Sequence, residues 1–158
     1  MPILRVTARE YLKKYNLDKN ILEFNTSSAT VAEAAIALSC EEKQIAKTLS
    51  FLVDDKPILI LAAGNTKIDN PKYKAFFHTK AKMIPFESVE PLIGHPVGGV
   101  CPFGIKDGVT VYLDVSLKAL DYFYPACGST NSAIKLTASQ LEEITGHPQW
   151  IDVCAVRG

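Results

Sequence analysis

The chain has 158 residues, of which 47% are hydrophobic and 22% charged, and its 17 basic side chains balance 17 acidic ones. This length predicts a single domain, 1–158, that buries a core without disulfide staples. Zero net charge argues against a protein that wraps long nucleic acid, so no DNA partner is expected. The longest apolar run, 58–63, is far shorter than the ~20 residues of a membrane helix, and Met1–Leu4 is too short for a secretory signal. We therefore expect a cytoplasmic protein without membrane contact.

The cysteine pattern indicates reduced thiols. The four cysteines, Cys40, Cys101, Cys127 and Cys154, form no Cys-x-x-Cys pair, and the three histidines are equally scattered. Structural zinc sites usually show short ligand spacings, which are missing here. We expect neither a metal nor another cofactor.

Helix starts are marked by capping boxes, in which a hydroxyl and a carboxylate or amide three residues later satisfy orphan N–H groups. Such pairs begin at Thr7, Thr30, Ser39 and Thr137, and Pro71 suits a first helical position. The predicted helices span 8–15, 31–38, 41–46, 70–77, 88–93 and 138–145.

The strand pattern centres on a hairpin. Two apolar runs, 48–53 and 57–63, flank a polar turn, and 109–114 alternates between apolar and polar residues. Shorter candidate strands span 21–24, 100–103, 122–126, 133–136 and 151–153. Interleaved helices and a hairpin-like centre predict an α/β fold: one compact domain with a mixed, mostly antiparallel, barrel-like sheet and helices around it.

The densest chemical signal is the glycine loop, Gly94–Gly104, with four glycines and two prolines in eleven residues. Glycine lets a backbone approach a ligand closely, and exposed N–H groups can hold an oxyanion or a carbonyl oxygen. The alternative is a structural turn between two strands. The loop is not a nucleotide-hydrolase phosphate loop, because no Gly-Lys-Ser/Thr follows it.

Two side chains are candidates for chemistry. Lys47 follows the predicted helix 41–46 and precedes an apolar strand. It either complements the helix dipole or places a partly desolvated ammonium at the mouth of a pocket. Cys101, inside the glycine loop, is the most tempting nucleophile, although a small buried thiol is the commoner role.

Two further segments could bind a ligand. Residues 67–82 carry five lysines against one aspartate, with aromatic residues interleaved. This segment either guides a nucleic-acid end or is a solvated helix face. The polar turn 127–132, which contains Gly128, Ser129 and Asn131, either lines a pocket or is an ordinary turn.

Together these motifs resemble the YbaK/EbsC family, which includes the insertion-type editing domain of bacterial prolyl-tRNA synthetase and its free-standing relatives. The resemblance covers about residues 29–153. It rests on motifs in a specific order and spacing: Lys47-Thr-Leu, Ala62-Ala-Gly64, Gly98-Gly-Val-Cys-Pro-Phe-Gly104, Asp114 and the Gly128 turn.

The resemblance implies a compact α/β fold and hydrolysis, in trans, of the ester that joins a wrong amino acid to tRNA. It implies an active site built from Lys47 and the Gly98–Pro102 loop, without a protein nucleophile, in which the substrate assists its own hydrolysis. The expected partners are the 3′ end of an aminoacyl-tRNA and, beyond it, an aminoacyl-tRNA synthetase. The expected substrate-binding residues are Thr30, Gly98, Gly99, Val100, Cys101, Pro102, Gly128, Ser129 and Asn131. The lysines expected to contact the tRNA backbone are Lys72, Lys74, Lys80 and Lys82.

One position departs from the family pattern. Several deacylases of this family carry an acidic residue where this chain has Ala133. Asn131 or Ser132 could serve instead. Two alternatives remain: a non-catalytic member that binds a synthetase or charged tRNA, and a thiol hydrolase that uses Cys101.

Overall fold

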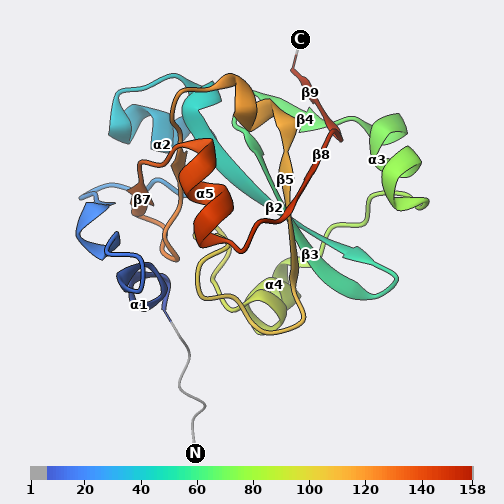
Figure 1. Ribbon diagram of the computed structural model, residues 1–158, viewed down its shortest axis with the longest axis horizontal. Helices are drawn as coiled ribbons and strands as arrows, with labels where there is room; N and C mark the ends of the chain where they lie inside the picture. The colour runs from blue at the N-terminus through green and yellow to red at the C-terminus, as the bar shows by residue number, and fades with distance from the viewer. Residues whose placement is uncertain (1–6, 158) are drawn as a thin grey trace, which may run out of the picture.

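The centre of the fold is a long β-hairpin (Figure 1). The computed structural model describes residues 7–157, so Met1–Leu4 and the outermost residues of the predicted domain lie outside it. The hairpin joins β2 (Ile45–Val53) to β3 (Lys56–Ala63) through Asp54 and Asp55, whose φ angles are 50° and 63°. Two positive φ angles define the turn type whose twist matches that of antiparallel strands.

Three more strands extend the hairpin into a five-stranded sheet of order β6-β2-β3-β5-β8. The added strands are β5 (Thr110–Asp114), β6 (Tyr124–Pro125) and β8 (Gln149–Ile151). Each of them pairs in parallel, so the mixed sheet is confirmed but the expected antiparallel majority does not hold within it. The reason is that long connections containing helices separate β3 from β5 and β5 from β8, as parallel neighbours require.

Two small antiparallel sheets complete the strands. One pairs β1 (Ile21–Glu23) with β7 (Ser132–Ile134), and the other pairs β4 (Thr66–Ile68) with β9 (Cys154–Val156). β4 and β9 were not predicted, because three-residue strands with mixed polarity carry no periodic signal.

Within residues 7–157, five α-helices surround the sheets: α1 (Ala8–Lys13), α2 (Val31–Leu38), α3 (Asn70–Phe77), α4 (Phe86–Ile93) and α5 (Ala138–Ile144). The predicted caps of α1, α2 and α5 are confirmed. The hydroxyl groups of Thr7, Thr30 and Thr137 each accept a hydrogen bond from the backbone N–H three residues later, at 3.1 to 3.2 Å. Short 3₁₀ turns occur at Asp18–Asn20, Glu42–Gln44 and Val115–Ala119.

Two predicted elements are wrong. The helix 41–46 is a single 3₁₀ turn, Glu42–Gln44, and Ser39 ends α2 in the left-handed conformation. β2 begins at Ile45 because that residue pairs with Tyr124 of β6, and the rest of the strand pairs with β3. The strand 100–103 is absent: these residues follow Gly98, whose φ of 89° turns the chain, and Pro102 has no N–H for a ladder.

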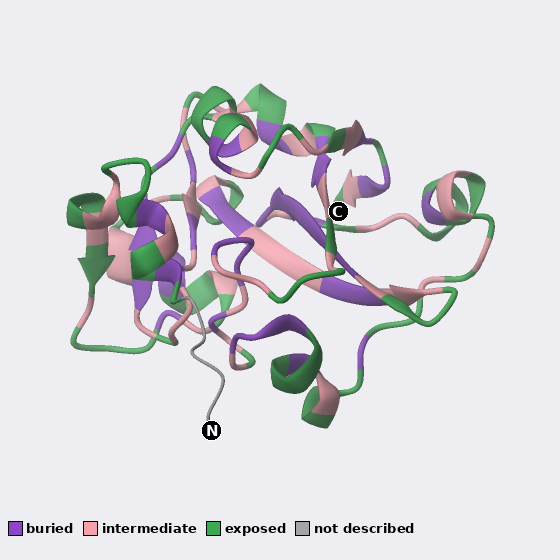
Figure 2. Cartoon of the chain, turned by 60° about the horizontal axis from the view of Figure 1, so that its bottom comes forward, coloured by how far each residue is buried: buried purple, intermediate pink, exposed green. Residues whose placement is uncertain are grey.

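The core lies on both faces of the sheet. Every residue from 58 to 63 in β3 is buried, and alternate side chains enter different apolar clusters. Figure 2 shows the buried colour along the central strands and the exposed colour mainly on the outer helices and loops. In the part of the chain that the structure describes, no helix is long and apolar enough to cross a membrane.

Candidate active site

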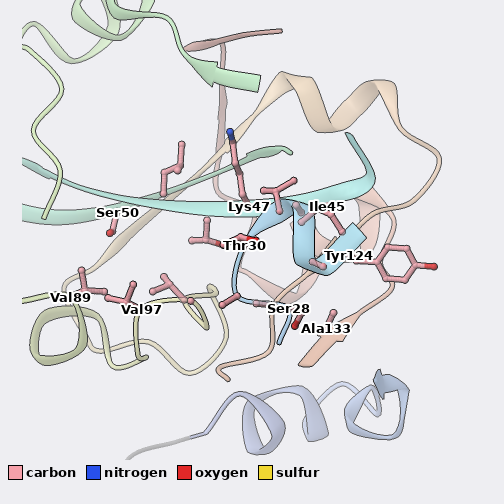
Figure 3. Close-up of a pocket in the computed structure, with 18 of the residues that line it drawn as sticks. Ser28, Thr30, Ile45, Lys47, Ser50, Val89, Val97, Tyr124 and Ala133 are labelled. Atoms are coloured by element: carbon pink, nitrogen blue, oxygen red, sulfur yellow. The ribbon is translucent and has the colours of Figure 1, made fainter. Parts of the chain in front are cut away.

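A cavity of about 400 Å³ lies beside β2 (Figure 3). One wall is the strand itself, from Ile45 to Ser50. The others come from residues 28–34, which lead into α2, from residues 83–89 at the start of α4, and from the glycine loop at Gly98 and Val100. Segments far apart in the sequence therefore meet at one site.

Strand geometry decides which β2 side chains face the cavity. Successive side chains of a strand point to opposite faces. Thr48 pairs with Leu61, and Ser50 pairs with Leu59. These two leucines pack into core clusters on one face, whereas Ala62, the partner of Lys47, packs into the cluster on the other.

Lys47 lines the cavity, but its ammonium points away from it. The Nζ atom donates a hydrogen bond to the carbonyl of Thr66, and Figure 3 shows it on the side of β2 opposite to the Ser50 side chain. Burial, and next the charge of Arg157, lowers the pKa of Lys47 below its ordinary value. Lys47 is mid-strand and not at a helix end, so the predicted dipole interaction does not arise. It is the one charged side chain among the described residues that line the cavity.

The glycine loop contributes its backbone. The N–H of Gly99 donates to the carbonyl of Pro96 at 3.0 Å and closes a turn through Gly98. The N–H of Gly99 is therefore already hydrogen-bonded, whereas the N–H groups of Gly98 and Val100 have no acceptor among the described residues. Gly98 and Val100 also line the cavity, and Gly99 does not. The available donors of this loop are thus the groups on either side of Gly99.

Cys101 and Pro102 face away from the cavity. Cys101 is fully buried in the core, with its Sγ 3.5 Å from Nε2 of His95. Burial raises the pKa of the Cys101 thiol to about 12, so the thiolate that a nucleophile needs is not populated near neutral pH. Pro102 lines a separate hollow beside Tyr11 and Gly104. The structure does not bring either residue to the predicted site.

The polar turn packs against the glycine loop. Gly128, Ser129 and Asn131 do not line the cavity. The side chain of Ser129 hydrogen-bonds with Asn131 at 3.1 Å and with Ser132 at 2.6 Å. A Cβ on Gly99 would lie 2.7 Å from the Ser129 nitrogen, so the two backbones are in direct contact.

The residues that follow this turn do reach the cavity. Ser132 and Ala133 both line it, and both are buried. Ala133 thus places a methyl group on the cavity wall. Thr30 also lines the cavity, but its hydroxyl is engaged by Glu33 through the α2 cap.

Several cavity residues were missed by the sequence analysis. Ser50 lies on the same strand face as Thr48, and the two-residue period of 48–53 could have identified it. Three apolar side chains at the cavity are exposed, and no sequence pattern marked them: Met83 by 62%, Phe86 by 75% and Val97 by 41%.

The predicted tRNA-contacting lysines lie outside the cavity. Lys72 forms an ion pair with Asp152 at 3.0 Å, which raises its pKa. Lys74, Lys80 and Lys82 are exposed, and Lys82 immediately precedes Met83 on the cavity wall. In the described part of the chain, no group of three His, Cys, Asp or Glu residues could hold a metal ion.

Fold and site together define a compact α/β domain with a cavity between the central strand β2 and a glycine loop. The model of the aminoacyl-tRNA editing domain matches residues 26–144, and the chain belongs to this family. It is 47% identical over 149 residues to the uncharacterized protein YwhH of Bacillus subtilis (strain 168), which covers 94% of this chain and 95% of that protein. It is 30% identical over 122 residues to a proline--tRNA ligase of Streptococcus equi subsp. equi (strain 4047), covering 75% of this chain but 19% of the ligase.

One solved structure has the same fold as this chain and nearly the same length. A protein described as a proposed trans-editing enzyme for prolyl tRNA synthetase superposes with a TM-score of 0.79 at 26% identity. The match covers 96% of this chain and 98% of that one. The expected fold and family resemblance are therefore confirmed.

Proposed function

We propose that this protein hydrolyses, in trans, the ester bond between a wrong amino acid and the 3′ end of tRNA. Membership of the aminoacyl-tRNA editing family supports the substrate class. The observation that carries the proposal is the cavity, where the unpaired N–H groups of Gly98 and Val100 meet apolar walls of a size suited to an acyl group.

The glycine loop supplies the electrostatic part of the reaction. Donors fixed in advance stabilise the oxyanion that forms when water attacks an ester carbonyl. The N–H groups of Gly98 and Val100 would hold this oxygen. The bond between the carbonyl carbon and the ribose oxygen then breaks, and the amino acid and the free tRNA end leave.

The substrate supplies the proton transfer in this proposal. No described residue that lines the cavity carries a carboxylate, an imidazole or a thiol, and the Lys47 amine is bound to Thr66. The attacking water therefore gives a proton to the free ribose hydroxyl beside the ester, and that hydroxyl passes its own proton to the ribose oxygen that leaves. Lys47 acts as an electrostatic group if its ammonium leaves the Thr66 carbonyl and turns to a phosphate or to the ester.

The exposed lysines provide the contact with tRNA. Lys80 and Lys82 lead to the cavity wall at Met83, so a phosphate chain bound along them would end at the cavity. Phosphate contacts position a nucleic acid without reading its sequence. Lys72 and Lys74 would extend this path along α3, and a synthetase could deliver the tRNA.

A panel of mischarged tRNAs tests this proposal directly. Multiple-turnover release of the amino acid from at least one of them is the expected result. A second candidate function, binding of charged tRNA without hydrolysis, is favoured by the buried methyl group of Ala133, at the position that we expect, from the sequence, to match the acidic residue of several family deacylases. Tight binding of the panel without release of any amino acid would establish that alternative.

A further inference from the structure

Ser50 presents a hydroxyl to the cavity that the protein leaves unsatisfied. The residue is only 8% exposed and lines the cavity. No described residue hydrogen-bonds its Oγ, and this oxygen, unlike that of Thr48, is not closed off from the cavity space. Figure 3 shows its oxygen directed from β2 toward the cavity on the side of Val89. The backbone is held in place, because the carbonyl of Ser50 accepts a hydrogen bond from Ile84 at 3.2 Å.

The surroundings of this hydroxyl are aliphatic. Ile84 and Val89 are buried cavity residues, and Val100 packs into the same cluster. A hydroxyl that opens on a cavity among aliphatic side chains can hydrogen-bond a bound ligand in place of water, and it is one of few polar groups there that could do so. Thr48, two residues earlier on the same strand face, also has a buried hydroxyl without a partner in the described structure. The cavity side of β2 is thus more polar than its packing alone requires.

We infer that Ser50 is a specificity-determining residue whose hydroxyl hydrogen-bonds the end of the acyl side chain. This inference rests on the proposed function. It makes the preferred substrate a hydroxyl-bearing acyl group, seryl or threonyl, over the apolar analogues alanyl and 2-aminobutyryl. The α-ammonium and the ribose are poorer occupants, because aliphatic neighbours would leave a charge or further hydroxyls unsatisfied.

The energetic logic favours this use of a serine. An apolar pocket discriminates weakly against a group that merely adds a hydroxyl, whereas a pocket that hydrogen-bonds a hydroxyl rejects the analogue that lacks it. One neutral hydrogen bond in such a site corresponds to about tenfold in relative rate. We therefore expect at least this preference for seryl over alanyl and for threonyl over 2-aminobutyryl.

The test compares Ser50→Ala with the wild type on tRNA carrying each of these four acyl groups. The ratio of kcat/KM for seryl to alanyl tRNA should fall about tenfold in Ser50→Ala, mainly through loss of the seryl rate. The matched control is Ser28→Ala. Ser28 is equally buried at 8% and lines the same cavity, but its hydroxyl donates to the Thr130 carbonyl at 3.4 Å. It should leave the ratio unchanged.

A binding measurement separates this inference from the proposed function. Adenosine carrying a seryl or an alanyl group through a stable amide can be titrated calorimetrically into each protein. Tighter binding of the seryl compound, lost in Ser50→Ala, supports the inference even if no ester is hydrolysed. An unchanged ratio, an equal loss for all acyl groups, or a wild type without preference for the hydroxyl would each overturn it. Thermal unfolding shows that Ser50→Ala is folded, and because no protein hydrogen bond is removed, its Tm should not fall below that of Ser28→Ala.

Discussion

The contact between the glycine loop and the Ser129 turn makes Gly99 the sharpest probe of the proposed site. In Gly99→Ala, the new Cβ would lie 2.7 Å from the Ser129 nitrogen and 2.8 Å from its Cα and carbonyl carbon. Ordinary contact begins at 3.4 Å, so the two backbones must separate by about 0.7 Å. The neighbour is backbone and cannot rotate away as a flexible side chain would.

The separation has consequences for both stability and rate. Forcing an extra carbon into a packed region typically costs about 1–3 kcal/mol. For a chain of this length, each kcal/mol lowers Tm by about 2–4 °C. A shift approaching 1 Å in the groups that hold a reacting atom can lower the rate about 10²-fold. Gly99→Ala should therefore be folded, somewhat less stable and at least this much slower in deacylation.

Two other glycines provide matched controls. Gly98 has a φ of 89°, and its Cβ would lie 2.9 Å from the Cβ of Ala29. Gly108 has the same φ, but its Cβ would meet nothing within 4 Å. Gly108→Ala thus measures the left-handed conformation alone, at about 1–2 kcal/mol, with no loss of activity. Gly98→Ala adds the steric overlap and should lose more stability, together with activity.

Urea unfolding measures the stability of each glycine variant, and the deacylation rate measures its activity. Together they test whether the glycine loop positions the ester. If Gly99→Ala is folded and fully active, the loop does not position the ester and the site assignment fails. If Gly99→Ala loses no more stability than an ordinary surface substitution, the close approach to Ser129 is itself refuted.

Three further predictions concern side chains. In the proposed mechanism the Lys47 ammonium turns from the Thr66 carbonyl to the substrate, so Lys47→Met should lower the deacylation rate by about 10²–10³ with the fold intact. Because burial lowers the pKa of Lys47 from its usual 10.5, its ammonium is lost at a lower pH than usual. The enzymatic rate should decline there in the wild type but not in Lys47→Arg; identical pH profiles would remove the charge from the mechanism. Cys101→Ser should retain most activity, and iodoacetamide should leave Cys101 unmodified in the native protein, because its pKa is about 12; a trapped acyl-enzyme would contradict this. Replacing the four predicted tRNA-contacting lysines with alanine should weaken binding to all tRNAs alike. It should also flatten the dependence of log K on log salt concentration, by roughly 0.7–0.9 in slope for each phosphate that is no longer neutralised. An unchanged slope would show that these four lysines do not contact tRNA phosphates and form only a solvated surface.

The sequence by itself determined the elements whose signals are local. Hydroxyl caps placed α1, α2 and α5, because the capping hydrogen bonds span only three residues. The apolar run of β3 indicated a strand, and the polar pair that follows β2 indicated the hairpin. The spacing of Lys47 and the glycine loop indicated the family, which the editing-domain match confirms.

Tertiary pairing decided the rest. Residues 45 and 46 are strand and not helix because β6 and β3 provide partners for them, and no local pattern encodes those partners. The direction in which Lys47 points follows from the register of that pairing, which places its ammonium on the face opposite to Ser50. Cys101 belongs to the core because the turn at Gly98 carries the chain inward. The cavity joins segments that lie far apart in the chain, from residue 28 to residue 133, so only the folded chain could show that a buried, unpaired serine stands among its walls.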